Sequence, residues 1–202
     1  MENKNDRPLV SFIVTTYNLP TTLLCECLQS ILSLSLSKEE REIIVVDDGS
    51  EVSPLNDLVE LRDKIVYVRQ RNKGLSEARN MGLVCAQGKF IQFVDGDDYL
   101  IQAPYEHCLD IARYKDADII LFHETEEEQP EVPFECNGPM TGSAYMHQYN
   151  LRASACGYLF RANILGNLRF TPNLLHEDEE FTPQLFLRAE HMYFTPSKAY
   201  YY

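Results

Sequence analysis

The sequence predicts an α/β fold with a mostly parallel central sheet, helices on both of its faces and a smaller extension. Residues 1–123 alternate short β-rich runs with helical patterns, which is typical of βαβ units. The apolar runs are nearly continuous, which indicates strands that are buried on both faces. With 202 residues, the chain is long enough to bury one substantial core.

Five strands and four helices are expected in this first part. The strands are predicted at residues 9–15, 42–46, 64–68, 89–94 and 118–122. The helices are predicted near residues 20–34, 54–62, 75–85 and 104–115. Three of these helices have a proline near the start, where its missing N–H would have no partner anyway.

The pattern changes after Phe122. Residues 124–133 are charged and contain prolines, which predicts a loop or a boundary. Helices are predicted at 141–149 and 177–190, with a short apolar segment at 157–160 between them. We therefore divide the chain into residues 1–123 and 124–202, as two parts of one domain. The aromatic run at the end has no terminating signal, so we expect the natural protein to continue.

Composition argues against nucleic acid as a partner. The chain has 31 acidic and 18 basic residues, a net charge of −13, which repels phosphates and anionic membranes. Residues 1–8 resemble neither a secretory signal nor a transit peptide, and no apolar run approaches the length of about 18 residues that a spanning helix needs. We expect a cytoplasmic location. The six cysteines lack a C-x-x-C pair, so we expect buried free thiols.

Polar clusters lie where four of the predicted strands end. They are Thr15-Thr16-Tyr17-Asn18, Asp47-Asp48-Gly49-Ser50, Asn72-Lys73-Gly74 and Asp95-Gly96-Asp97-Asp98. In an open parallel sheet, ligands bind outside the carboxyl ends of the strands. The sequence therefore predicts a polar crevice at this edge, although each cluster alone is also ordinary turn chemistry.

The fourth cluster suggests a metal site. Asp95, Asp97 and Asp98 place three carboxylates within four residues, and these repel one another unless a cation or strong donors compensate. Mg²⁺ and Mn²⁺ typically bind through one or two carboxylates, with substrate phosphates completing the shell. A diphosphate leaving group would supply those oxygens and would also need cationic side chains. Arg79 is a candidate cation, or a surface arginine. Tyr17 could stack on a nucleobase, or be a buried structural tyrosine.

A carboxylate is also needed to remove the proton from an acceptor hydroxyl. Residues 176–181 (His-Glu-Asp-Glu-Glu-Phe) offer four candidates. Acidic residues in the first turn of a helix complement its dipole without any catalytic role, so the residues alone do not choose among them.

Taken together, the strand-end clusters, Ala78-Arg79-Asn80 and residues 176–181 closely resemble the family 2 glycosyltransferases of the GT-A fold. The resemblance covers essentially the whole chain. It implies an inverting transferase that moves a sugar from a nucleoside-diphosphate donor, usually UDP-linked, to a saccharide or lipid-linked acceptor. It also implies Mg²⁺ or Mn²⁺, and a role in capsular, exopolysaccharide or lipopolysaccharide synthesis at the inner membrane face.

The resemblance also assigns roles to individual residues. Nucleotide contacts fall on Thr15, Tyr17, Asp48, Arg79 and Asp95. Asp95 and Asp97 match the DxD motif, with Asp97 as the first choice for the metal ligand. Asp178 falls on the catalytic base, with Glu177 and Glu179 as alternatives. Residues 1–123 then form the nucleotide-sugar-binding half, and residues 124–202 the acceptor side.

The main rival is a non-catalytic module that binds a nucleotide sugar without turnover. Such a module would lack a metal-binding or base carboxylate, and this chain lacks neither. A sugar-phosphate nucleotidyltransferase would need a glycine- and arginine-rich loop after the first strand. A receiver domain would need an Asp after the third strand and a Lys after the fifth, where Asn72 and His123 stand.

Overall fold

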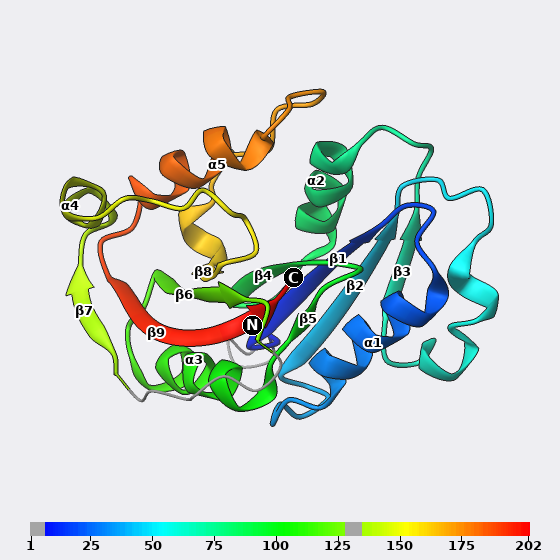
Figure 1. Cartoon of the computed structure of the whole chain (residues 1–202), viewed down its shortest axis with the longest axis horizontal. Coiled ribbons are helices and arrows are strands. Elements are labelled where there is room, and N and C mark those ends of the chain that lie inside the picture. Colours follow the sequence, from blue (N-terminus) through cyan, green and yellow to red (C-terminus); the bar gives the residue numbers. More distant parts are fainter. Residues whose placement is uncertain (1–6, 128–134) are drawn as a thin grey trace, which may run out of the picture.

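The computed structural model describes residues 7–127 and 135–202, which form one curled sheet with helices around it (Figure 1). The strands are β1 (Val10–Thr16), β2 (Arg41–Asp47), β3 (Val66–Arg69), β4 (Phe90–Asp95), β5 (Tyr99–Leu100), β6 (Ile119–Thr125), β7 (Asn137–Met140), β8 (Tyr158–Arg161) and β9 (Met192–Tyr201). Their order is β3-β2-β1-β4-β8-β6-β9-β5, and β7 pairs with β9 beside this path.

The helices are α1 (Thr21–Leu32), α2 (Leu75–Cys85), α3 (Gln102–Tyr114), α4 (Gly142–Gln148) and α5 (Glu177–Phe186), with 3-10 turns η1 (Pro54–Asn56), η2 (Val59–Leu61) and η3 (Ala162–Ile164). Within the described residues, no helix combines the length and the apolar character needed to cross a membrane.

The sheet formed by β1 to β4 is parallel, which confirms the prediction of a mostly parallel sheet for this part of the chain. β1 lies between β2 and β4, in parallel with both, and β2 pairs in parallel with β3. Every residue of β1 is buried, because strands flank it on both sides and the sheet's faces are covered. All four strands point the same way, so their carboxyl ends meet at one edge.

Two predictions near the outer edge are wrong. β3 is not buried on both faces: it has β2 as its single neighbour, and Val66 is 46% exposed. The predicted helix at 54–62 is replaced by η1 and η2. Pro54 and Leu58 are the buried residues of that segment, so it has too little apolar surface to hold a longer helix.

The other half of the sheet is mixed. β8 inserts antiparallel between β4 and β6, and β6 runs parallel to β9. The proposed division at residues 123 and 124 falls inside β6, and the sheet is continuous across it. A hydrophobic pattern indicates that a segment is a strand, but it does not show which strands will be its neighbours. The position of β8 in the sheet was therefore not expected. The strands β5 and β7 were not expected either.

The ends of the later elements also differ from expectation. α5 ends at Phe186 rather than near residue 190, because the chain turns there into β9. Glu124 and Thr125 belong to β6 rather than to a loop. Residues 128–134 of that predicted loop lie outside the described residues. All six cysteines are free thiols, as predicted, but Cys136 is exposed and Cys25 and Cys85 are half-buried.

Candidate active site

The four strand-end clusters converge on one cavity of about 480 Å³, which we call the strand-end cavity. It is lined by Thr15, Thr16, Tyr17, Leu19, Asp48, Asn72, Gly74, Leu75, Ala78, Asp95, Gly96 and Asp97. Each of the four clusters contributes at least one residue, which confirms the predicted crevice.

Asp48 shapes this cavity as well as lining it. Its buried carboxylate accepts hydrogen bonds from the backbone N–H groups of Lys73 (2.9 Å) and Gly74 (2.8 Å) and from Nε2 of Gln70 (2.7 Å). Gly49, with φ +82°, lets the two turns meet, since a Cβ there would lie 2.7 Å from the nitrogen of Asn72. The turns after β2 and β3 are therefore locked together.

Tyr17 and Thr15 lie on the β1 side of the cavity. Tyr17 is 51% exposed, so it is not a buried structural tyrosine, and its ring is free to meet a ligand. Thr15 is buried and lies within 3.3 Å of Oδ1 of Asp95, to which its hydroxyl donates. The end of β1 is thus tied to the end of β4.

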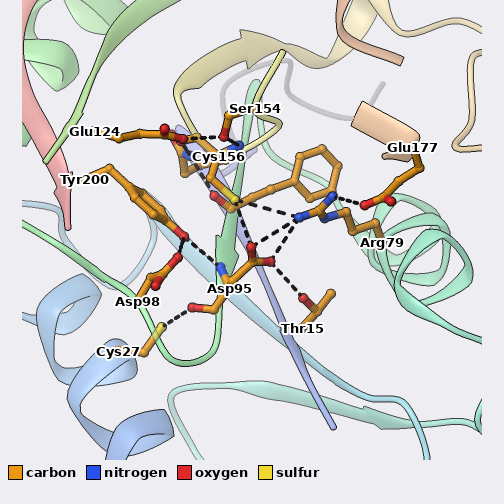
Figure 2. Close-up of polar contacts among 12 residues, drawn as sticks. Thr15, Cys27, Arg79, Asp95, Asp98, Glu124, Ser154, Cys156, Glu177 and Tyr200 are labelled. Carbon is orange, nitrogen blue, oxygen red and sulfur yellow. Dashed lines mark hydrogen bonds and ion pairs between the residues drawn. The ribbon is translucent and has the colours of Figure 1, made fainter. Parts of the chain in front are cut away.

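Arg79 lies at the centre of a buried ionic network (Figure 2). It is 3% exposed, and it bonds Asp95 through Nη2 (3.0 Å) and Glu177 through Nη1 (2.7 Å). The rings of Phe93 and Phe170 lie 5.8 and 5.4 Å from its guanidinium carbon. Burial by itself would lower the pKa of Arg79, but the negative charges beside it, Asp95 first, raise that pKa above its usual value.

This placement excludes one of the two interpretations of Arg79. It is buried and therefore not a surface arginine, whereas its assignment as a nucleotide contact stays a prediction. It lies behind Asp95 and connects β4 to the first turn of α5. The Nε atom of Arg79 is buried without a hydrogen-bond partner among the described residues. The buried guanidinium is therefore stabilised by the two carboxylates and the two aromatic rings.

The three clustered carboxylates lie in different surroundings, and this relieves part of the predicted repulsion between them. Asp95 is paired with Arg79, Asp97 is exposed at the cavity, and Asp98 accepts a hydrogen bond from Tyr200 (2.7 Å). Burial, and then the charges of Asp95, Asp97 and Glu124, raise the pKa of Asp98 to about 6 against the opposing effect of the Tyr200 bond.

Asp95 and Asp97 form a two-carboxylate arrangement at the rim of the cavity. Within residues 7–127 and 135–202, no three His, Cys, Asp or Glu side chains gather closely enough to hold a metal ion by themselves. Mg²⁺ and Mn²⁺ commonly take further oxygens from phosphate groups and water, so the pair fits a site that a diphosphate completes.

A second cavity of about 400 Å³, which we call the α5 cavity, lies on the other side of Asp95. It is lined by Asp95, Asp98, Glu124, Arg152, Ala153, Ser154, Cys156, His176, Asp178, Glu179, Tyr200 and Tyr202. Asp95 is the residue that lines both cavities. The two spaces therefore meet at one carboxylate.

The α5 cavity separates the candidates for a base. Glu177 is held by Arg79, whereas Asp178 and Glu179 line the cavity from the first turn of α5. Sequence reasoning missed Glu124, Arg152 and Tyr200, which come from β6, from the segment before β8 and from β9. None of them follows a strand of the parallel half, so the strand-end rule could not find them.

The sheet order, with a cavity at the carboxyl ends of the parallel strands, is that of the GT-A fold, which the structural neighbour TarS shares. The family model "Glycosyl transferase family 2" matches residues 11–149, and the chain belongs to this family.

Relatives of the chain cover nearly all of it. The uncharacterized glycosyltransferase EpsJ of Bacillus subtilis is 31% identical over 96% of this chain and 61% of its own length. The poly(ribitol-phosphate) beta-glucosyltransferase of Bacillus spizizenii is 29% identical over 96% of this chain and 32% of its own. S. aureus TarS 1-349 in complex with UDP-GlcNAc has a TM-score of 0.80 at 27% identity, covering 96% of this chain and 58% of that one. The chain thus spans about three fifths of EpsJ and of the TarS structure.

Proposed function

We propose that the chain is an inverting, metal-dependent glycosyltransferase that moves a sugar from a UDP-sugar to an acceptor hydroxyl. The observation that carries this proposal is the position of Asp95, which lines both the strand-end cavity and the α5 cavity. A nucleotide sugar whose diphosphate lies at Asp95 would reach from one cavity into the other. The complex of TarS with UDP-GlcNAc supports a UDP-linked donor.

Each end of the donor has matching residues. The nucleoside would lie in the strand-end cavity, with Tyr17 against the base, and with Thr15 and Asp48 beside it. Asp97 and Asp95 would hold Mg²⁺ or Mn²⁺, which when bound supplies a Lewis acid for the leaving diphosphate. Arg79 fixes the carboxylate of Asp95 and so acts through it, as a positioning residue.

Asp178 would receive the proton of the acceptor hydroxyl in the α5 cavity. The acceptor oxygen would attack the sugar carbon from the side opposite the diphosphate while the bond from that carbon to the diphosphate oxygen breaks and UDP leaves, which inverts the configuration of the sugar carbon. Arg79 holds Glu177, the preceding residue, and this fixes the turn that presents Asp178. We assign the reaction to cell-surface polysaccharide synthesis, which the glucosyltransferase relative supports. The cytoplasmic location and association with the inner membrane face stay predictions.

The Asp178→Asn variant tests this proposal against a non-catalytic binding module. We expect the affinity for UDP with Mn²⁺, measured by calorimetry, to stay within about twofold, because the base acts on the acceptor. Turnover of the donor should fall by about 10²- to 10⁴-fold. Glu180→Gln is the matched control, since Glu180 is exposed on the same helix and does not line the cavity. Unchanged turnover in Asp178→Asn would remove the assigned base.

A further inference from the structure

The α5 cavity holds an excess of negative charge where the transferred sugar would lie. Its acidic and basic lining consists of five carboxylates, one arginine and one histidine. They are Asp95, Asp98, Glu124, Asp178, Glu179, Arg152 and His176. The carboxylates come from β4, the loop after β4, β6 and α5. The negative charge therefore lies on several sides of the cavity and does not belong to a single element.

The arginine offsets one of these charges, but it is not available to a ligand because it is already paired with Glu124. Nη2 of Arg152 lies 2.9 Å from Oε2 of Glu124, whose side chain is 7% exposed. The other oxygen of Glu124 accepts a hydrogen bond from the hydroxyl of Ser154 (Figure 2). The guanidinium of Arg152 also lies over the ring of Tyr202, 5.5 Å from its centroid. Glu124 therefore holds Arg152, the one arginine that lines the cavity, in an ion pair.

Three carboxylates of the cavity have no cationic partner. Asp95 is paired with Arg79, but Asp98, Asp178 and Glu179 form no ion pair in the described part of the chain. A divalent cation held by Asp95 and Asp97 would be shared with the diphosphate, which is itself anionic. The cavity as a whole therefore disfavours a second negative group on the ligand.

We propose that the sugar transferred by this chain is uncharged, a neutral hexose or an N-acetylhexosamine, and that Glu124 is the residue that rejects sugars bearing a carboxylate. This inference rests on the proposed function, because the diphosphate at Asp95 is what directs the sugar into the α5 cavity. Glu124 enforces the selection by occupying Arg152, the cation that would otherwise bind a carboxylate.

Calorimetric titration of the chain with UDP, UDP-glucose and UDP-glucuronic acid, each with Mn²⁺, tests the proposal. The two sugars differ at one carbon, which carries either a hydroxymethyl group or a carboxylate. We expect UDP-glucose to bind at least as tightly as UDP, and UDP-glucuronic acid to bind about tenfold more weakly than UDP, since a neighbouring like charge has an effect of this size. UDP-glucuronic acid that binds as well as UDP-glucose would overturn the proposal.

The Glu124→Gln variant tests the assigned residue. We expect it to bind UDP like the unchanged chain and to regain about tenfold in affinity for UDP-glucuronic acid, because Arg152 becomes free. Glu126→Gln is the matched control, since Glu126 is exposed and does not line the cavity. If the ratio of the affinities for UDP-glucose and UDP-glucuronic acid is the same in Glu124→Gln as in the unchanged chain, Glu124 does not determine the selection. Failure of UDP itself to bind would overturn the donor site, which is a different result from failure of the selection.

Discussion

Asp97 is the exposed carboxylate of the acidic cluster, and this exposure favours it as the proposed metal ligand. Its neighbours are engaged, Asp95 with Arg79 and Asp98 with Tyr200. We therefore expect Asp97→Ala to fold normally and to lose about 10²-fold or more in Mn²⁺-dependent turnover, because the metal stabilises charge on the leaving group. Steady-state assays over a range of Mn²⁺ concentrations measure this loss. Asp63→Ala, at a highly exposed site, is the control, and full metal-dependent activity in Asp97→Ala would contradict the assignment.

Asp47, beside the site, acts on stability. Burial raises its pKa, but hydrogen bonds from Ser50 and Tyr67 and the charge of Arg69 outweigh burial and leave the pKa below the usual 3.8. A lowered folded-state pKa stabilises the protein at pH values above the unfolded-state pKa, and this stability is lost as the pH falls through the folded-state value.

The Asp47→Asn variant measures this contribution. At pH 7 we expect it to reduce the free energy of unfolding by about 1–3 kcal/mol, since it weakens hydrogen bonds to a buried charged group. The difference from the unchanged chain should begin to shrink as the pH drops below about 4, where Asp47 of the unfolded chain becomes protonated, and should shrink further as the pH falls through the lower folded-state pKa. Urea titrations at pH 7 and pH 3.5 provide the measurement. A difference that is equal at both pH values would mean that the charge of Asp47 contributes nothing.

Helix α2 is the element that positions Arg79, and its distance from the sheet depends on Gly82. A Cβ at Gly82 would collide with the side chain of Ile13 in β1, so the helix lies directly on the strand there. We expect Gly82→Ala to destabilise the fold by about 1–3 kcal/mol and to lower donor affinity, because Arg79 lies one turn earlier. Val84→Ala, at a 72% exposed site on the same helix, should change stability by about 0.5 kcal/mol or less.

Chemical denaturation and UDP titration of both helix variants measure these two effects. Equal stability of Gly82→Ala and Val84→Ala would show that α2 can move away from β1 without cost.

The whole molecule brings the proposed nucleotide side and the proposed base side together through one sheet. β8, from the later part of the chain, inserts between β4 and β6. Arg79 joins β4 to α5 through Asp95 and Glu177 (Figure 2). A donor that contacts both sides should therefore stabilise the entire fold. At a ligand concentration of 100 Kd, the expected gain is about 2.7 kcal/mol, or a rise in Tm of about 5 °C or more.

Thermal unfolding with UDP, with Mn²⁺ and with both together measures this coupling. We expect the combination to raise Tm by more than the sum of the separate effects, because the diphosphate completes the metal site. A Tm that does not respond to UDP with Mn²⁺ would be incompatible with a shared metal and nucleotide site. Asp97→Ala is the control, since it should lose the additional rise.

The sequence by itself determined the parallel half of the sheet, the edge where the strand-end cavity lies and the residues that gather there. This was possible because strand period and strand-end turns are local properties, and because parallel strands share one carboxyl edge. It also limited the candidates for the base to residues 176–181. Helix 54–62 failed because propensity alone does not show whether a segment has a face to bury.

Only the tertiary structure decided which of those residues are buried in ion pairs and which line a cavity. Arg79 is buried behind Asp95, Glu177 is engaged by Arg79, and Glu124 faces the α5 cavity. These contacts join residues as far as 98 positions apart. Burial and ion pairing depend on which strands become neighbours, and the insertion of β8 between β4 and β6 is not encoded in the pattern of any single segment.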